Sequence, residues 1–251
     1  MEDRDRRARS FGAVADRYAR ARPGYPQAAV EWLLEGAPGR KVVDLAAGTG
    51  KLTQVLVESG AAPIAVEPDA GMRAALVTAV PGVEAMEGSA EAIPLPDACA
   101  DAVLVAQAFH WFDPERACDE IARVLRPGGV LGLLWNLRDG SVPWVADLDR
   151  ILDWPADVVA RAGDLSFEEI ERHPLFAVGG RREFPNPVGF TPSRLVDWAA
   201  STSRVATRPE PEREAVLAGV AELTRTHPDL CRQPVFAMPY TTVAIRFGRS
   251  R

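Results

Sequence analysis

Short hydrophobic runs alternate with helical repeats along the first half of the chain. The runs predict strands, beginning with KVVDL and PIAVEPD and continuing at 83–86, 101–107 and 130–135. Between these runs, apolar residues recur every three or four positions, which predicts helices at 51–59, 71–80 and 114–125. Alternation of this kind indicates a parallel sheet that helices cover on both faces.

The alternation stops after Asp139, where helical pieces interrupted by Trp, Pro and Gly take over. Two further strands are predicted, a short one at 181–184 and the alternating stretch YTTVAIRF at 240–247. The helices predicted outside the alternating region lie at 9–22, 27–34, 147–151, 155–162, 167–171, 191–203 and 212–226.

Length and charge limit the classes of protein that fit. The chain has 251 residues, of which 47% are hydrophobic, enough for one large domain. Its formal net charge is −6 and no basic face is evident, so nucleic acid is not an expected partner. No apolar run approaches the ~18 residues of a membrane helix, and MEDRDRRARS is not a signal peptide, so no membrane partner is expected either.

The cysteines and histidines predict neither a disulfide framework nor a metal site. Three cysteines, Cys99, Cys118 and Cys231, lack CxxC spacing, which favours the reducing cytoplasm as the location. No HExxH, HxxxH or close acidic triad is present, so no metal is expected, and without a GxSxG elbow a serine hydrolase is disfavoured.

A glycine-bearing turn follows the first strand of the alternating region, and an acid follows the second. The turn runs from Asp44 to Gly50, and in an open α/β sheet this position binds a nucleotide-like ligand. Glu67 ends the second strand, where an acid can accept hydrogen bonds from both ribose hydroxyls. A dinucleotide site would need a third glycine, and Asp44 would repel a pyrophosphate. Asp44 instead suits an ammonium group, such as that of S-adenosylmethionine.

Five consecutive motifs resemble those of a class I S-adenosylmethionine-dependent methyltransferase. They are VVDLAAGTGKLT, AVEPDAGM, GSAEAIPLPD, VAQAFHWFD and EIARVLRPGGVLGLLWN. FHWFD and the earlier RYARARPGYP are similar to the small-molecule branch, which includes trans-aconitate methyltransferase-like and natural-product tailoring enzymes. The resemblance implies an α/β, Rossmann-like, doubly wound and mostly parallel seven-stranded sheet with an antiparallel C-terminal strand and a helical lid insertion.

We therefore expect one domain with an inserted lid. Residues 1–138 form the S-adenosylmethionine-binding core with an N-terminal helical cap, and 139–180 form the helical lid insertion. The strands and helices of 181–251 complete the same domain. The protein is expected to be a monomer or a homodimer.

The resemblance also assigns the cofactor contacts. Asp44 and the backbone of the turn hold the methionine end, and Glu67 takes the ribose hydroxyls. The family usually has glycine at the position of Ala46, and an acid where this chain has Ser89. Tyr18 either closes over the site or is a buried staple of its helix. The full set of expected cofactor contacts is Tyr18, Arg22, Asp44, Ala46, Ala47, Gly48, Gly50, Glu67, Pro68, Met72, Ser89, Ala90 and Gln107.

The stretch AQAFHWFDPE lies where the fourth strand ends, at the edge of the sheet where donor and acceptor should meet. His110 is the candidate catalytic residue, because a hydroxyl acceptor needs a base that titrates near neutrality. A role in shaping the pocket is the alternative, since a carboxylate or a tertiary amine needs no base. The expected substrate contacts are Tyr25, Trp111, Trp135 and Asn136.

The expected activity is transfer of a methyl group to an oxygen, of a carboxylate or hydroxyl, or to a nitrogen of a small metabolite, with S-adenosylhomocysteine as the second product. A secondary metabolite is the favoured acceptor. Two alternatives stay open: a non-methylating enzyme, such as a cyclase, on the same fold, or a cofactor-binding regulatory protein.

Overall fold

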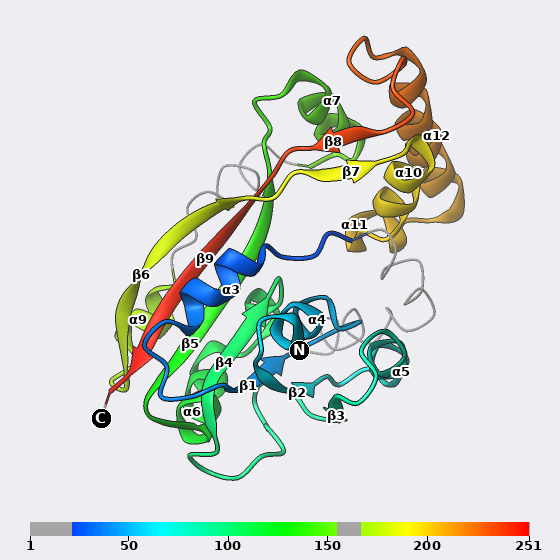
Figure 1. Cartoon of the computed structure of the whole chain (residues 1–251). Helices are drawn as coiled ribbons and strands as arrows, with labels where there is room; N and C mark the ends of the chain where they lie inside the picture. The colour runs from blue at the N-terminus through cyan, green and yellow to red at the C-terminus, as the bar shows by residue number, and fades with distance from the viewer. Residues whose placement is uncertain (1–21, 155–166, 251) are drawn as a thin grey trace.

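A seven-stranded sheet forms the centre of the protein, in a computed structural model that describes residues 22–154 and 167–250 (Figure 1). The strand order is β3-β2-β1-β4-β5-β9-β6, and β9 pairs antiparallel with both β5 and β6 while the other pairs are parallel. This confirms the predicted fold class. The strands are β1 Lys41–Leu45, β2 Ala62–Val66, β3 Glu84–Met86, β4 Ala100–Ala106, β5 Leu125–Arg138, β6 Phe176–Pro185 and β9 Tyr240–Arg249.

Helices cover both faces of this sheet. Because successive residues of a strand point to opposite faces, Val42 of β1 packs with helices α3 (Gln27–Leu34) and α4 (Lys51–Glu58), whereas Val43 packs with α6 (Pro114–Val124) and α9 (Glu168–Arg172). Helix α5 (Ala70–Ala79) follows β2, and the 3-10 turn η2 (Phe109–Trp111) follows β4. The sheet is therefore doubly wound, as the alternation of strands and helices predicts.

The fifth strand is longer than its hydrophobic run. We predicted that RPGG forms a turn before a strand at 130–135, but β5 begins at Leu125, which pairs with Ala100. The register then shifts, so that Val130 pairs with Ala102. Gly128, with a φ of 79°, takes up the irregularity inside the strand, as glycine does at a bulge.

A second hydrophobic core lies in a helical layer beyond the ends of β5 and β6 (Figure 1). The residues of this core precede and follow β6 in the chain. The boundary between lid and C-terminal part, expected near residue 180, falls inside β6. The predicted helices at 9–22 and 155–162 lie outside the described residues. The layer consists of α7 (Pro143–Ile151), β7 (Val188–Phe190), α10 (Pro192–Ala200), α11 (Ser203–Ala206), α12 (Glu210–Thr226) and β8 (Phe236–Met238).

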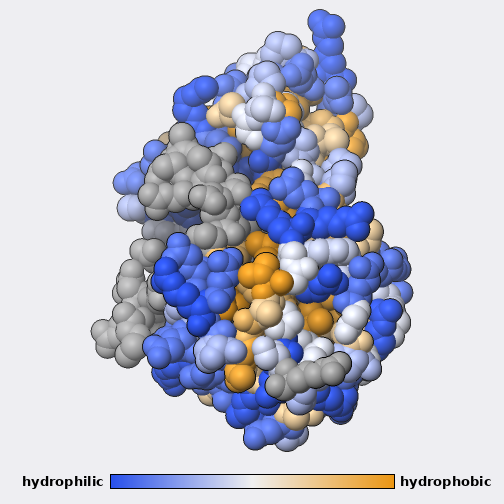
Figure 2. All heavy atoms as spheres, turned by 90° about the vertical axis from the view of Figure 1, so that its left-hand side faces the viewer, coloured by the Kyte–Doolittle hydropathy of each residue, from blue (hydrophilic) through white to orange (hydrophobic). Residues whose placement is uncertain are grey.

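Strand β6 lies at the edge of the sheet, on the side of the molecule that Figure 2 turns to the viewer. This surface is mostly hydrophilic, with a band of hydrophobic residues down its middle (Figure 2). Leu175 and Val178, at the edge strand, are among the exposed large hydrophobic residues. In the part of the chain that the structure describes, no helix is both long enough and apolar enough to cross a membrane.

Candidate cofactor and substrate site

The turn between β1 and α4 has three residues in the left-handed region. Ala46, Gly48 and Gly50 have φ values of 57°, 56° and 83°. Left-handed backbone favours glycine, so Ala46 is the one residue of the three whose Cβ makes this conformation costly. A Cβ built on Gly48 would meet nothing within 4 Å, whereas one on Gly50 would lie 2.9 Å from Cγ of Leu76. The first glycine therefore leaves space beside the turn, and the second allows close packing.

Asp44 places a buried carboxylate at this turn. Its Oδ2 accepts a hydrogen bond of 2.5 Å from Oγ1 of Thr53 in α4. Its Oδ1 is buried and has no partner. The pKa of Asp44 is raised from 3.8 to about 7, mainly by burial, which outweighs the lowering by the hydrogen bond from Thr53; the charge of Glu67 adds to the rise. An unsatisfied carboxylate oxygen at this position suits a cationic donor such as an ammonium group.

Glu67 links the turn to the start of α5. Its Oε2 accepts a hydrogen bond of 2.9 Å from the backbone N–H of Gly48, and its Oε1 accepts one of 2.9 Å from that of Asp69. Burial raises the pKa of Glu67, while these two bonds lower it in part. A carboxylate has about four lone-pair sites, so it can still accept hydrogen bonds from a ligand.

The two residues that donate to Glu67 line two different clefts. Gly48 lines the first cleft and Asp69 lines the second. The residues of the first are Arg22, Pro23, Tyr25, Asp44, Ala46, Ala47, Gly48, Thr49, Lys51, Leu52, Ala106, Gln107 and Asn136. Those of the second are Pro68, Asp69, Ala70, Glu87, Gly88 and Ser89. The structure thus brings most of the expected cofactor contacts together, with two expected substrate contacts, Tyr25 and Asn136, in the first cleft.

The remaining expected residues take other positions. Met72 and Ala90 are buried, and Tyr18 lies outside the described residues. His110 is exposed on η2 with its ring 4.7 Å from that of Trp111, and neither residue lines the two clefts above. Trp135 is only 6% exposed and packs 5.1 Å from the ring of Phe167. Its alternation with Leu131 and Leu133 along β5 places it in the core on the α6 side.

The side chain of Asn136 ties the segment before α3 to the sheet. Its Nδ2 donates to the carbonyl of Gly24 at 3.0 Å, and its Oδ1 accepts from Oγ1 of Thr242 at 2.5 Å and from Nδ2 of Asn186 at 3.1 Å. Asn186 also donates to the carbonyl of Gly24 at 3.0 Å. Asn186 and Thr242 were missed in the sequence because they are remote from Asn136 in the chain and belong to no motif. The network holds Tyr25, which follows Gly24, at the first cleft.

Gln107 and Arg22 line the same cleft from two directions. Gln107 has a φ of 58°, and its Nε2 donates to the backbone carbonyl of Asn136 at 3.3 Å. Arg22 reaches the helical layer, where its Nε and Nη2 donate to the side chain and carbonyl of Ser201 at 3.2 and 3.1 Å. The segment that bears Arg22 runs from α3 toward α11 (Figure 1). The first cleft therefore lies where sheet and helical layer meet.

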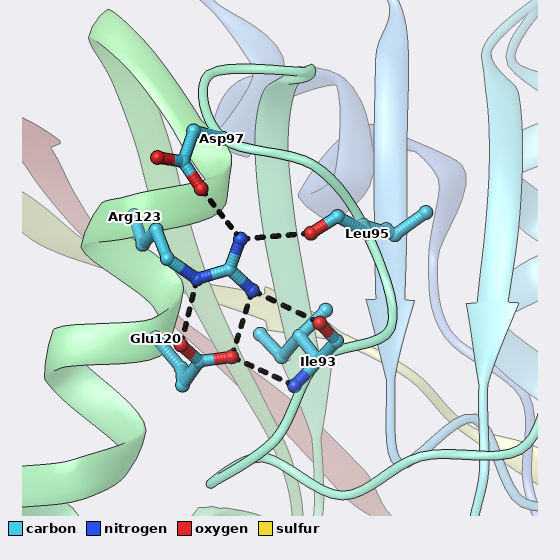
Figure 3. Close-up of polar contacts among 5 residues, drawn as sticks. All are labelled: Ile93, Leu95, Asp97, Glu120 and Arg123. Atoms are coloured by element: carbon cyan, nitrogen blue, oxygen red, sulfur yellow. Dashed lines mark hydrogen bonds and ion pairs between the residues drawn. The ribbon is translucent and has the colours of Figure 1, made fainter.

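Arg123 of α6 fastens the loop between β3 and β4 (Figure 3). Its Nη1 donates to the carbonyl of Leu95 and to Oδ1 of Asp97, both at 2.8 Å, and its Nη2 donates to the carbonyl of Ile93 at 2.9 Å. Glu120 pairs with the same guanidinium and accepts from the backbone N–H of Ile93 at 2.9 Å. The same loop also contains Ser89, which lines the second cleft.

Replacing Arg123 by Ala is expected to lower the free energy of unfolding by about 1–3 kcal/mol, because several charge-assisted hydrogen bonds are lost from a partly exposed site. The change should be measured by urea denaturation followed by circular dichroism. Arg116→Ala, at an exposed position of the same helix, is the matched control and should change stability by less than ~0.5 kcal/mol. Equal stability of the two variants would contradict the anchoring role.

Fold and site together define a Rossmann-like protein with a glycine-bearing turn after its first strand. A family model described as a methyltransferase domain matches residues 43–133. The chain is 46% identical over 239 residues to an uncharacterized methyltransferase of Mycobacterium tuberculosis, covering 94% of each chain. It is 37% identical over 242 residues to an uncharacterized methyltransferase-like protein of Schizosaccharomyces pombe, covering 92% of this chain and 91% of the other.

A solved structure shares this architecture. It is that of a proposed type II methyltransferase from Anaeromyxobacter dehalogenans, with a TM-score of 0.65, 26% identity and coverage of 91% of this chain and 97% of the other. The chain belongs to the class I S-adenosylmethionine-dependent methyltransferases, and it is an enzyme of that family.

Proposed function

We propose that this enzyme binds S-adenosylmethionine in the two clefts and methylates an oxygen or nitrogen of a small metabolite, in particular a secondary metabolite. The observation that supports this most strongly is Asp44, whose buried Oδ1 has no partner at the edge of a cleft. The turn lacks the third glycine of a dinucleotide site, and the family model that matches the chain is a methyltransferase domain, so both favour this cofactor over a dinucleotide. The cofactor supplies a methyl group activated by positively charged sulfur.

In this proposal the residues of the chain bind and orient. Asp44 accepts a hydrogen bond from the ammonium of the cofactor, and the backbone around Gly48 approaches its methionine portion closely because no Cβ intervenes. Glu67 accepts hydrogen bonds from the ribose hydroxyls, while Pro68 and Ser89 line the space for the adenine. Gln107 and Tyr25 delimit the end of the cleft where the acceptor enters.

Methyl transfer requires the protein to align the acceptor with the methyl group and to exclude water. Arg22 and Tyr25 would do so from the segment that the Asn136 network holds in place. If the acceptor is a hydroxyl, His110 takes its proton; if it is a carboxylate or a tertiary amine, His110 only shapes the approach. We place the enzyme in the cytoplasm, in keeping with cysteines that are free at all three positions.

Cofactor choice is tested by calorimetry. The protein should bind S-adenosylhomocysteine and should not bind NAD at the same concentration. Methyl-labelled S-adenosylmethionine is then incubated with a panel of small carboxylic acids, phenols and amines, and the products are weighed by mass spectrometry. Methylation adds one CH₂, whereas cyclisation changes no mass. Failure to bind S-adenosylhomocysteine at 1 mM would refute the proposed function.

The variants His110→Ala and His110→Gln distinguish a role of His110 as a base from a role in shaping the pocket. If the accepted substrate is a hydroxyl, we expect turnover to fall by about 10²- to 10⁴-fold in both variants, because a positioned base supplies a factor of this size. Affinity for S-adenosylhomocysteine should stay within twofold. His173→Gln is the control, since His173 contacts Asp119 and lines neither cleft. Unchanged turnover of such a hydroxyl substrate would exclude the base role.

A further inference from the structure

Three guanidinium groups gather around one tyrosine where the sheet meets the helical layer. Tyr240 is the first residue of β9 and is only 5% exposed. Its burial raises the pKa of its phenol, and the charges of Arg138, Arg22 and Arg194 lower it in part. These arginines come from the end of β5, the segment before α3 and the first turn of α10. Cationic side chains from separate parts of the chain thus face one buried point.

Three N–H donors in this cluster are buried and have no partner. They are Nε of Arg138, Nε of Arg194 and Nε1 of Trp198. Trp198 is only 1% exposed, and the guanidinium of Arg138 lies 4.8 Å from the centre of its ring. A buried donor without an acceptor is costly, and native proteins keep few of them. Three such donors among neighbouring side chains therefore need an explanation.

The terminal nitrogens of Arg138 and Arg194, unlike their Nε atoms, have partners within the protein. Arg138 pairs with Asp149 of α7, with Nη2 and Oδ1 2.5 Å apart. Arg194 donates from Nη1 to the carbonyl of Gly189 at 2.6 Å, and its guanidinium lies 4.6 Å from the ring centre of Phe190. Within residues 22–154 and 167–250, Arg194 makes no ion pair. Its positive charge is therefore compensated by dipoles and a ring, not by a carboxylate that it contacts.

The cluster borders the first cleft. Lys51, in the first turn of α4, lines that cleft and makes no ion pair among the residues that the structure describes. Burial lowers the pKa of Lys51, and the nearby charge of Arg194 lowers it further. Arg22 lines the cleft too, and its guanidinium lies 5.9 Å from the ring centre of Trp198. Arg22 and Lys51 thus connect the cleft to the buried donors behind it.

We infer that Arg138, Arg194 and Trp198, together with Lys51, form a binding site for an oxyanion, a carboxylate or a phosphate group, of the acceptor substrate. This inference rests on the proposed function and narrows its substrate class to anionic metabolites. An oxyanion accepts several hydrogen bonds at once and so can satisfy the three donors. It also offsets the mutual repulsion of Lys51 and Arg194, which is strong where water is excluded. Arginine is well suited to such groups because its donors are fixed in one plane.

The test uses the indole N–H of Trp198 as a reporter. Protein labelled with ¹⁵N and saturated with S-adenosylhomocysteine is titrated with citrate, with inorganic phosphate and with glycerol as a neutral control. The chain has six tryptophans, and W198F identifies the signal of Trp198, with through-space contacts as a second assignment. We expect citrate or phosphate to shift this signal saturably and glycerol to leave it in place. Citrate alone points to a carboxylate, and phosphate alone to a phosphorylated acceptor.

Arg194→Gln should weaken the binding of that anion at least tenfold and leave affinity for S-adenosylhomocysteine within twofold. Arg194 is preferred to Arg138 for this test, because removing Arg138 would leave Asp149 without its ion-pair partner. Arg225→Gln, at the end of α12 where Arg225 pairs with Glu222 on the surface, should bind the anion as the unmodified protein does.

Three results would overturn the inference. Neither anion shifts the signal at 10 mM in protein that binds S-adenosylhomocysteine; Arg194→Gln binds the anion with unchanged affinity; or the anion displaces S-adenosylhomocysteine, which would assign the cluster to the carboxylate of the cofactor. Failure of S-adenosylhomocysteine to bind at all is a different outcome, since it refutes the proposed function before the anion is added.

Discussion

Asp44→Asn is expected to weaken binding of S-adenosylhomocysteine by about 10- to 100-fold, the loss that follows when a charge-assisted hydrogen bond becomes a neutral one. The side chain keeps its shape and can still accept the hydrogen bond from Thr53. The fold should therefore persist, and calorimetry on folded protein measures the loss directly. Asp229→Asn, an exposed change in the loop after α12, is the control.

The same variant has a second, independent signature in stability. The pKa of Asp44 rises from 3.8 to about 7 on folding, so the folded state favours the protonated acid. Its contribution to stability is fully present below about pH 4 and is lost as pH rises through about 7. Urea denaturation at pH 5 and pH 8 should show that Asp44→Asn loses less stability over this interval than the unmodified protein.

If Asp44→Asn bound S-adenosylhomocysteine normally, the proposed ammonium contact would be wrong.

Gly50→Ala is expected to cost about 2–5 kcal/mol of folding free energy, a large part of the total for a domain. The left-handed φ of 83° costs an alanine about 1–2 kcal/mol, and the new Cβ would lie 2.9 Å from Cγ of Leu76, which adds an overpacking penalty of about 1–3 kcal/mol. Urea denaturation would measure this cost. The clash arises at the N-terminus of α4, so the whole turn should be affected.

Gly48→Ala is the matched comparison. Its φ of 56° is also left-handed, but a Cβ there meets nothing within 4 Å, so a loss of only about 1–2 kcal/mol is expected. Ala46, with a φ of 57°, shows that the turn accepts one alanine in this conformation. Because Gly48 lines the first cleft, its substitution should lower affinity for S-adenosylhomocysteine at least tenfold. Equal destabilisation by the two alanines would show that the clash with Leu76 is relieved without cost.

Local signals predicted the sheet well. The short runs that became β1, β2 and β4, and the helices between them, follow from side-chain periodicity, which depends on near neighbours. Asp44, Gly48 and Gly50 could be selected because the turn is continuous in the chain. The clash partner of Gly50 could not, since Leu76 belongs to α5 and meets the turn only after folding.

Long-range contacts explain what the sequence did not reveal. The Asn136 network joins β5, β9 and the segments beside α3 and β6, and the Arg123 network joins α6 to a loop. The helical layer was not predicted as one unit, because its core combines α7, which precedes β6 in the chain, with α10–α12, which follow it. Trp135, an expected substrate contact, lies on the same face of β5 as Leu131 and Leu133, because residues two apart in a strand point the same way. That face packs in the core.

The position of β9 has a consequence for how the chain acquires its structure during synthesis. The ribosome makes β6 before β9, yet β9 lies between β5 and β6 in the sheet. Until the last strand emerges, β6 has no neighbour to pair with and β5 offers an open edge, so both are exposed to pairing with other nascent chains. The central sheet can therefore close only after translation of β9, and a stop codon before Tyr240 would leave a chain that chaperones and proteases must handle.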